Sequence, residues 1–165
     1  MADAYIIDAV RTPRGIGKPG KGALSHLHPQ HLAATVLKAL KERNHLDTAT
    51  VDDIIWSTST QKGKQGGDLG RMAALDAGFD IKASGMTLDR FCGGGITSVN
   101  LATASVMSGM EDCVIAGGTD ASLDERLLAR LGGDELAGVD PDVLDVACIA
   151  TAVDARLLAA ALPGR

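Results

Sequence analysis

Short apolar runs alternate with segments of helical periodicity along most of this chain, and no other feature limits its possible folds as strongly. Four runs have the length and character of strands, at residues 4–10, 54–60, 85–90 and 113–118. The segments between them predict helices at 29–44, 69–78 and from 92 to about 109. We expect the first run, AYIIDAV, to be a buried strand. The alternation favours a layered α/β fold with crossover connections.

The composition of the chain narrows the range of functions that we expect for it. The chain has 165 residues, of which 45% are apolar and only 2% aromatic, so we expect a globular core of aliphatic side chains. A net charge of −5 without a Lys/Arg block argues against a nucleic-acid partner. No apolar run approaches the ~18 residues of a membrane span. The N-terminus lacks the basic start of a secretory signal.

Three widely spaced cysteines, an odd number, argue against a disulfide framework and for a reducing compartment, so a cytoplasmic location is expected. Cys113 and Cys148 lie within apolar runs and are predicted to be core residues. The histidines are expected at the surface, at positions 26, 28, 31 and 45. No Cys or carboxylate stands at a useful spacing from them, so no metal site is predicted.

The composition changes abruptly after Ser122. From Leu123 to Arg165 there is no Lys, Ser, His, Asn, Gln or aromatic residue. We therefore divide the chain into a domain at 1–122 and a divergent Ala/Leu/Asp-rich tail at 123–165, in which DERLLARL and ARLLAAAL have helical character. Two explanations fit the tail. It is a frameshifted or truncated gene product, or it is a genuine short form that pairs with a separate C-terminal subunit.

The stretch FCGGGITS raises the question of function. If a helix begins at or just after Cys92, the thiol lies near unpaired backbone N–H groups and the positive end of the helix dipole, which favours the nucleophilic thiolate. Three following glycines, Gly93 to Gly95, would let a substrate carbonyl approach closely, although each costs a helix up to ~1 kcal/mol.

Other interpretations of this stretch remain open from the residues alone. Cys92 can equally be a small buried hydrophobe, with the glycines marking tight helix packing. A phosphate-binding loop at GGGITS has less support, because the GxxxxGK[ST] pattern is absent. Asp89 and Arg90, just before Cys92, are expected to be a solvated pair.

Several separated motifs occur in an order that resembles the N-terminal half of the thiolases, the acetyl-CoA acetyltransferases and 3-ketoacyl-CoA thiolases. They are IIDAVRTPRG, VDDIIW, GRMAALDAG and FCGGGITSVNLATASVMSGMEDCVIAGGTD. The resemblance covers residues 4–122. It implies a thiolase-like layered fold, in which this half has a mixed, mostly parallel sheet with helices on both faces. It also implies that Cys92 takes the acyl group as a thioester and that its backbone N–H helps to form an oxyanion hole.

The implied activity is acyl transfer on coenzyme A thioesters, by Claisen condensation or thiolysis, as in fatty acid metabolism and β-oxidation. The acyl-CoA is a substrate, and no bound cofactor or metal is implied. The residues that bind coenzyme A cannot be assigned. The resemblance also implies a homo-oligomer for the full-length family.

Three motifs of the family's C-terminal half are not found in this sequence: a His in Gly-His-Pro, a second Cys in Cys-x-Gly, and an Asn-Glu motif. His28-Pro29 follows Leu27, not Gly. The sheet is expected to lack its last strand. An alternative function is therefore a catalytically inactive thiolase-like fragment that acts by association with itself or with a partner, such as the missing C-terminal half.

Overall fold

The computed structural model describes residues 3–13, 15, 23–24, 26–119 and 150–153. Its helices are α1 (Pro29–Arg43), α2 (Leu69–Asp76) and α3 (Gly94–Ser108). Its strands are β1 (Ile6–Val10), β2 (Asp53–Thr58), β3 (Met86–Asp89), β4 (Val114–Gly118) and β5 (Ala150–Val153). Short 3₁₀ turns occur at Thr48–Thr50, Gly63–Gln65 and Phe91–Gly93.

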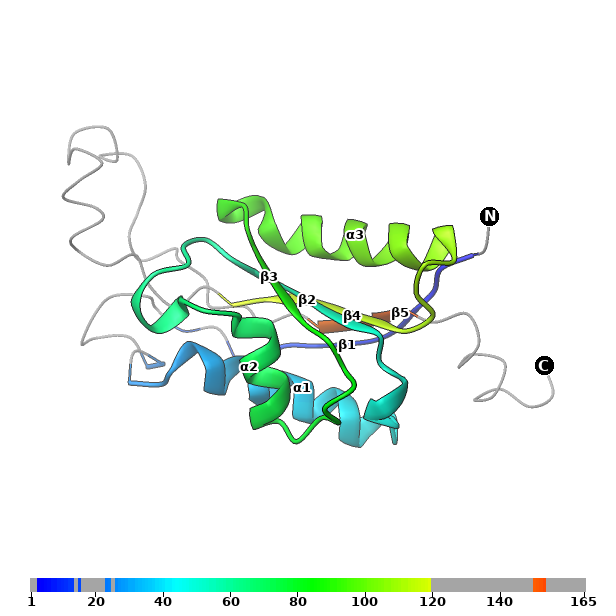
Figure 1. Ribbon diagram of the computed structural model, residues 1–165. Coiled ribbons are helices and arrows are strands. Elements are labelled where there is room, and N and C mark those ends of the chain that lie inside the picture. The colour runs from blue at the N-terminus through cyan, green and yellow to red at the C-terminus, as the bar shows by residue number, and fades with distance from the viewer. Residues whose placement is uncertain (1–2, 14, 16–22, 25, 120–149, 154–165) are drawn as a thin grey trace.

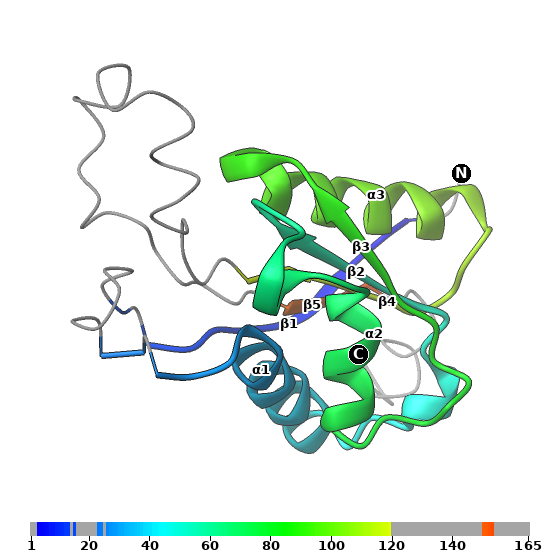
Figure 2. The same ribbon diagram turned by 60° about the vertical axis from the view of Figure 1, so that its left-hand side comes forward.

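The strands form one five-stranded sheet in the order β1-β5-β4-β2-β3. β2 pairs in parallel with both β3 and β4, whereas β5 is antiparallel to its neighbours β4 and β1. α1 and α2 cover one face of the sheet and α3 covers the other (Figures 1 and 2). The predicted layered α/β fold with a mixed, mostly parallel sheet is confirmed. No helix in the described part of the chain has the length and apolar character to cross a bilayer.

The helices begin and end at residues whose types favour those positions. Pro29 occupies the first position of α1, and His28 Nδ1 accepts a hydrogen bond from the Gln30 N–H at 3.3 Å. Asp68 caps α2 by accepting from the Arg71 N–H at 3.0 Å. Gly109, which follows α3, has a φ of 75°, a conformation that glycine adopts at little cost. The predicted helices therefore match the observed ones to within a few residues.

Two expectations about the strands are wrong. β1 is not a buried strand: it lies at an edge of the sheet, Ile6 is 63% exposed, and only Val10 is buried. The sheet also does not lack its last strand, because β5 pairs with β1 on one side and with β4 on the other. A four-residue strand flanked on both sides obtains its backbone hydrogen bonds from its neighbours, so its sequence signal can be weak.

The remaining predictions for the tail, which are the helices in DERLLARL and ARLLAAAL and a buried Cys148, lie outside the described residues. The division at residue 122 stays a prediction for the same reason.

The core is divided by the sheet into two parts. Strand β2 alternates between them, because Ile54 and Trp56 face α1 and α2 whereas Ile55 faces α3. The Trp56 indole N–H donates to Thr119 Oγ1 at 3.0 Å, and both side chains are buried. The part under α3 is built from smaller side chains: Ile55, Ala102, Val106, Val114 and Ala116.

α3 begins in direct contact with β2. A Cβ placed on Gly94 would lie 1.6 Å from Ser57 Oγ and 2.9 Å from Ser57 Cβ. A Cβ on the neighbouring Gly95 would have no heavy atom within 4 Å. Glycine is therefore required by packing at residue 94 and not at residue 95.

This difference predicts opposite effects of one substitution at adjacent positions. Gly94→Ala should lower the free energy of unfolding by about 1–3 kcal/mol, because the added methyl group overpacks the α3–β2 contact. Gly95→Ala should be neutral or raise it by up to ~1 kcal/mol, because alanine favours the helix. Urea denaturation followed by circular dichroism measures both. Equal destabilisation by the two variants would contradict the packing assigned to Gly94.

Carboxylates gather at the amino ends of β2 and β4. Asp52 Oδ2 accepts hydrogen bonds from the backbone N–H groups of Asp112 at 2.7 Å and Cys113 at 3.0 Å, which joins the two strand starts. Burial raises the pKa of the nearby Glu111 carboxyl group. A hydrogen bond from Ser105 acts in the opposite direction, and the charges of Asp53 and Asp52 raise the pKa further.

The raised pKa of Glu111 predicts how stability depends on pH. The unfolded chain loses this proton at a lower pH than the folded chain, so stability should fall as pH rises from the ordinary glutamate range through the raised pKa. Glu111→Gln removes this contribution. Its urea midpoint should therefore exceed that of the wild type at about pH 7 and converge with it at about pH 4. A midpoint difference that is the same at both pH values would contradict this account of Glu111.

Candidate functional site

Cys92 lies in the short turn that joins β3 to α3. Because β2, β3 and β4 run parallel, their carboxyl ends meet at the same edge of the sheet. The Cys92 turn follows β3 at this edge, after Asp89, the last residue of that strand, and leads into α3 (Figure 1). Loops at the carboxyl ends of parallel strands commonly form binding sites in open α/β sheets. The topology therefore places Cys92 where this fold class builds its sites.

The Cys92 turn has a strained backbone. The Gly93 N–H donates to Arg90 O at 3.1 Å, and the Gly94 N–H donates to Phe91 O, so two successive bonds close the turn. Phe91, directly before Cys92, has a φ of 42°, in the left-handed region that bulky residues rarely occupy. Such strain often occurs at functional sites, where the surrounding contacts hold it.

The two described cysteines differ in accessibility. Cys92 is exposed and Cys113 is buried, with a relative exposure of 1%. The interpretation of Cys92 as a buried hydrophobe is therefore wrong, whereas the prediction of Cys113 as a core residue is confirmed. Within the described part of the chain, neither cysteine forms a disulfide.

The three glycines after Cys92 have different surroundings. Gly94 packs against Ser57, whereas a Cβ on Gly95 would meet nothing and one on Gly93 would only touch the Arg90 side chain at 4.0 Å. The first turn of α3 also has no side-chain cap. The first N–H of the helix, that of Gly94, instead donates to Phe91 O. The open surface at Gly93 and Gly95 lets a ligand oxygen approach the backbone of the turn closely.

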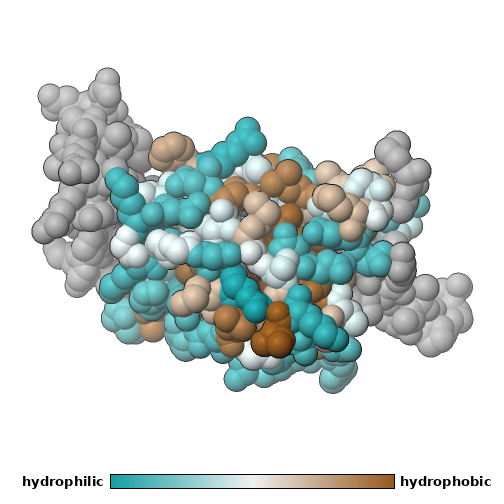
Figure 3. Space-filling view, in the orientation of Figure 1, coloured by the Kyte–Doolittle hydropathy of each residue, from teal (hydrophilic) through white to brown (hydrophobic). Residues whose placement is uncertain are grey.

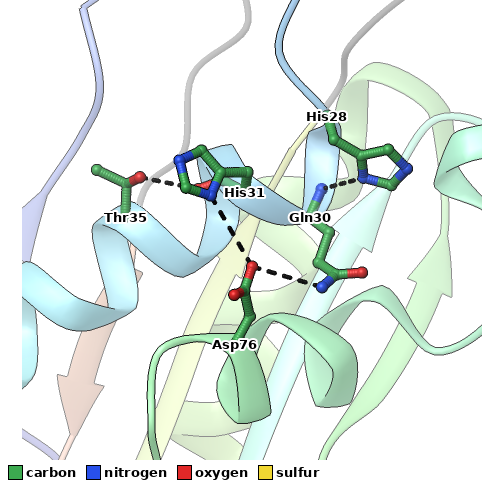
Figure 4. Close-up of polar contacts among 5 residues, drawn as sticks. All are labelled: His28, Gln30, His31, Thr35 and Asp76. Atoms are coloured by element: carbon green, nitrogen blue, oxygen red, sulfur yellow. Dashed lines mark hydrogen bonds and ion pairs between the residues drawn. The ribbon is translucent and has the colours of Figure 1, made fainter.

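The histidines contribute to the fold around α1. His28 caps this helix, and Asp76 of α2 accepts a hydrogen bond from Gln30 Nε2 at 3.4 Å and lies 4.0 Å from His31 Nδ1 (Figure 4). All four histidines are exposed, as predicted. α1 lies on the face of the sheet opposite to α3 (Figure 2). Among the described side chains, no histidine is hydrogen bonded to Cys92.

No group of three or more His, Cys, Asp or Glu residues in the described part of the chain is arranged to hold a metal ion.

The structure adds Thr97, which the sequence interpretation missed, and gives Arg90 a hydrogen-bond partner. Asp89 and Arg90 are both exposed, as predicted, and Arg90 Nη1 also donates to Thr97 Oγ1 at 3.1 Å. Thr97 Oγ1 in turn donates to the Gly93 carbonyl oxygen at 3.0 Å. The signal in the sequence is the spacing of four residues between Gly93 and Thr97, at which a threonine in a helix can bond back to the preceding turn.

Comparison with known proteins places this chain in a family. The sequence model of the family described as "Thiolase, N-terminal domain" matches residues 4–126. A steroid 3-ketoacyl-CoA thiolase of Mycobacterium tuberculosis is 40% identical over 118 residues, which are 72% of this chain and 28% of the relative. A 3-oxoadipyl-CoA/3-oxo-5,6-dehydrosuberyl-CoA thiolase of Escherichia coli is 39% identical over 122 residues, which are 73% of this chain and 30% of the relative.

Among solved structures, the acetyl-CoA acetyltransferase of Bacillus anthracis is similar, with a TM-score of 0.65 and 32% sequence identity over 72% of this chain and 29% of that one. The chain thus spans about three tenths of the length of the relatives it matches. The match of the family model over most of the chain, together with these relatives and the fold, shows that the chain belongs to the thiolase family.

Proposed function

We propose that this chain carries the acyl-accepting part of a thiolase-type acyltransferase, with Cys92 as the nucleophile and an acyl-CoA thioester as the substrate. The observation that carries the proposal is the position of Cys92: an exposed thiol in a strained turn, at the uncapped start of α3 and at the carboxyl edge of the parallel strands. The printed names of the relatives, which are thiolases and an acetyltransferase, support the substrate class.

The acylation step follows from this placement. Cys92 Sγ attacks the acyl carbonyl carbon, and the bond between that carbon and the sulfur of coenzyme A breaks. The acyl group stays on Cys92 as a thioester. The thiol proton passes to water or buffer, and the coenzyme A thiolate that leaves takes up a proton from the solvent. The backbone N–H of Cys92 helps to stabilise the oxygen that becomes negatively charged in the tetrahedral intermediate.

The second half-reaction needs groups that the described residues do not bring to Cys92. An acid or base must act on the second substrate that attacks the acyl-enzyme. The proposal therefore assigns acyl acceptance to this chain, and the complete condensation or thiolysis to the chain together with a C-terminal half. A cytoplasmic role in fatty acid metabolism, including β-oxidation, is part of the same proposal.

Incubation with acetyl-CoA tests this function. The intact mass of the wild-type chain should increase by one acetyl group, because the nucleophile and the oxyanion donors lie in the same turn. Cys92→Ser should remain unmodified under the same conditions. Cys113→Ser is the matched control and should be acetylated like the wild type, because Cys113 is buried. An unmodified wild-type chain that is folded by circular dichroism would reject the proposal.

A second function, association through α3, is favoured by the surface of that helix. None of the residues from Gly94 to Ser108 is charged, although Ile96 is 71% exposed and Leu101 is 42% exposed. Phe91, just before the helix, is 70% exposed. Figure 3 shows brown and pale residues among teal ones over the layer that α3 occupies. Helices with apolar residues on both faces are normally covered by another layer of protein.

We assign this surface to a partner, either the C-terminal half of a thiolase or a second copy of the chain. Leu101→Lys should weaken any self-association, because it puts a charge into the contact. Sedimentation velocity should then show a species larger than a monomer for the wild type and a monomer for Leu101→Lys. Ile81→Lys is the control at an exposed apolar residue outside α3, and it should behave like the wild type. Identical sedimentation of wild type and Leu101→Lys would exclude self-association through this face.

A further inference from the structure

We propose that Arg90 and Thr97 are positioning residues for Cys92. Neither side chain reacts with the substrate in this proposal. They hold the backbone of the Cys92 turn in the geometry that acyl transfer needs. This inference rests on the proposed function of Cys92 and adds the residues on which its reactivity toward a thioester depends.

A closed chain of hydrogen bonds surrounds Cys92. The Arg90 carbonyl oxygen accepts from the Gly93 N–H at 3.1 Å, which fixes one side of the turn. The Arg90 guanidinium donates to Thr97 Oγ1 at 3.1 Å, and Thr97 Oγ1 donates to the Gly93 carbonyl oxygen at 3.0 Å. Both the N–H and the C=O of Gly93, the residue after Cys92, are therefore tied to Arg90, one directly and one through Thr97.

The Thr97 hydroxyl group is essential to this arrangement. A hydroxyl has one proton to donate and lone pairs to accept, and here it does both at once. Serine can reproduce the two bonds, whereas valine has the same shape and can make neither. Asp89 does not compete for the guanidinium, because its Oδ2 accepts from the Gln61 N–H at 3.3 Å. No other described residue has a carboxylate within ion-pair distance of Arg90.

Apart from the bond from the Gly94 N–H to Phe91 O, few contacts restrain the turn. Phe91 has a φ of 42° and a side chain that is 70% exposed, so packing does not hold its unfavourable conformation. Gly93 has no side chain and its Cβ position is nearly open, so its backbone can relax readily once the bonds are lost. Gly94, fixed against Ser57, provides the anchored end. The bonds from Arg90 and Thr97 therefore hold the other end of the turn, so that the backbone on both sides of Cys92 is fixed.

Two reactions of the Cys92 thiol distinguish an effect on its positioning from an effect on its exposure to solvent. Acyl transfer from acetyl-CoA requires the sulfur and the oxyanion donors to meet the carbonyl in one geometry, and small displacements can cost up to ~10²-fold in rate. Alkylation by iodoacetamide has no oxyanion to stabilise and depends on access to the sulfur and on the fraction of Cys92 that is thiolate. Loss of the network should therefore reduce the first rate much more than the second.

The experiment compares Thr97→Val, Thr97→Ser, Arg90→Ala and the double variant Arg90→Ala/Thr97→Val with the wild type. Thr103→Val is the matched control, since it makes the same change further along α3 and outside the turn. For each variant we would measure the acetylation rate of Cys92 by mass spectrometry, its alkylation rate, and the hydrogen exchange of the Gly93 and Gly94 amides by NMR.

We expect Thr97→Val to lower the acetylation rate about tenfold, with alkylation changed by less than about twofold and faster amide exchange at both glycines. Thr97→Ser should restore wild-type rates, and Thr103→Val should match the wild type. The double variant should be no slower than the slower single variant, because both residues act through one network.

The proposal is overturned if Thr97→Val keeps the acetylation rate and the amide exchange of the wild type, or if Thr103→Val has the same effect as Thr97→Val. If the wild type itself is not acetylated, the proposed function fails. In that case, unchanged amide exchange in Thr97→Val overturns the positioning network as well, and faster exchange supports it independently of the chemistry.

Discussion

The contact between Gly94 and Ser57 is the constraint on which the site depends. It brings the start of α3 against the carboxyl end of β2, closer than any residue with a side chain would allow. Ser98, one turn later and fully buried, has its Oγ 2.8 Å from Gly95 O and 3.1 Å from Gly117 O, which joins the same helix to β4. With the helix fixed to two strands, the turn that carries Cys92 has a defined position at the edge of the sheet.

The described part of the chain thus combines a rigid support with an accessible thiol. Packing requires glycine at residue 94, whereas the glycines at 93 and 95 leave open surface beside Cys92. A purely structural helix would gain nothing from the glycine at 95, because alanine at that position would favour the helix. The glycines at 93 and 95 instead leave open backbone surface next to the exposed sulfur, which suits the close approach of a substrate carbonyl in the proposed reaction.

Much of the fold could be predicted from the sequence, because its signals are local. Pro29 and Asp68 mark helix starts and Gly109 follows a helix end, and the structure has all three in those roles. The edge position of β1 and the existence of β5 could not be predicted, because both depend on strand pairing between distant segments. At the site, Cys92 and its glycines stand out in the sequence. The link from Arg90 through Thr97 to Gly93 does not, since it needs the turn to be folded before the side chains meet.

The central claim is that Cys92 accepts an acyl group as a thioester, and ¹³C NMR of the chain after incubation with acetyl-CoA labelled at the carbonyl carbon tests it most directly. The account predicts a protein-bound carbonyl resonance in the thioester region that disappears on treatment with hydroxylamine and is absent from Cys92→Ser. A protein-bound resonance only in the amide region, which would reflect acetylated lysine, or no protein-bound resonance at all, would contradict it.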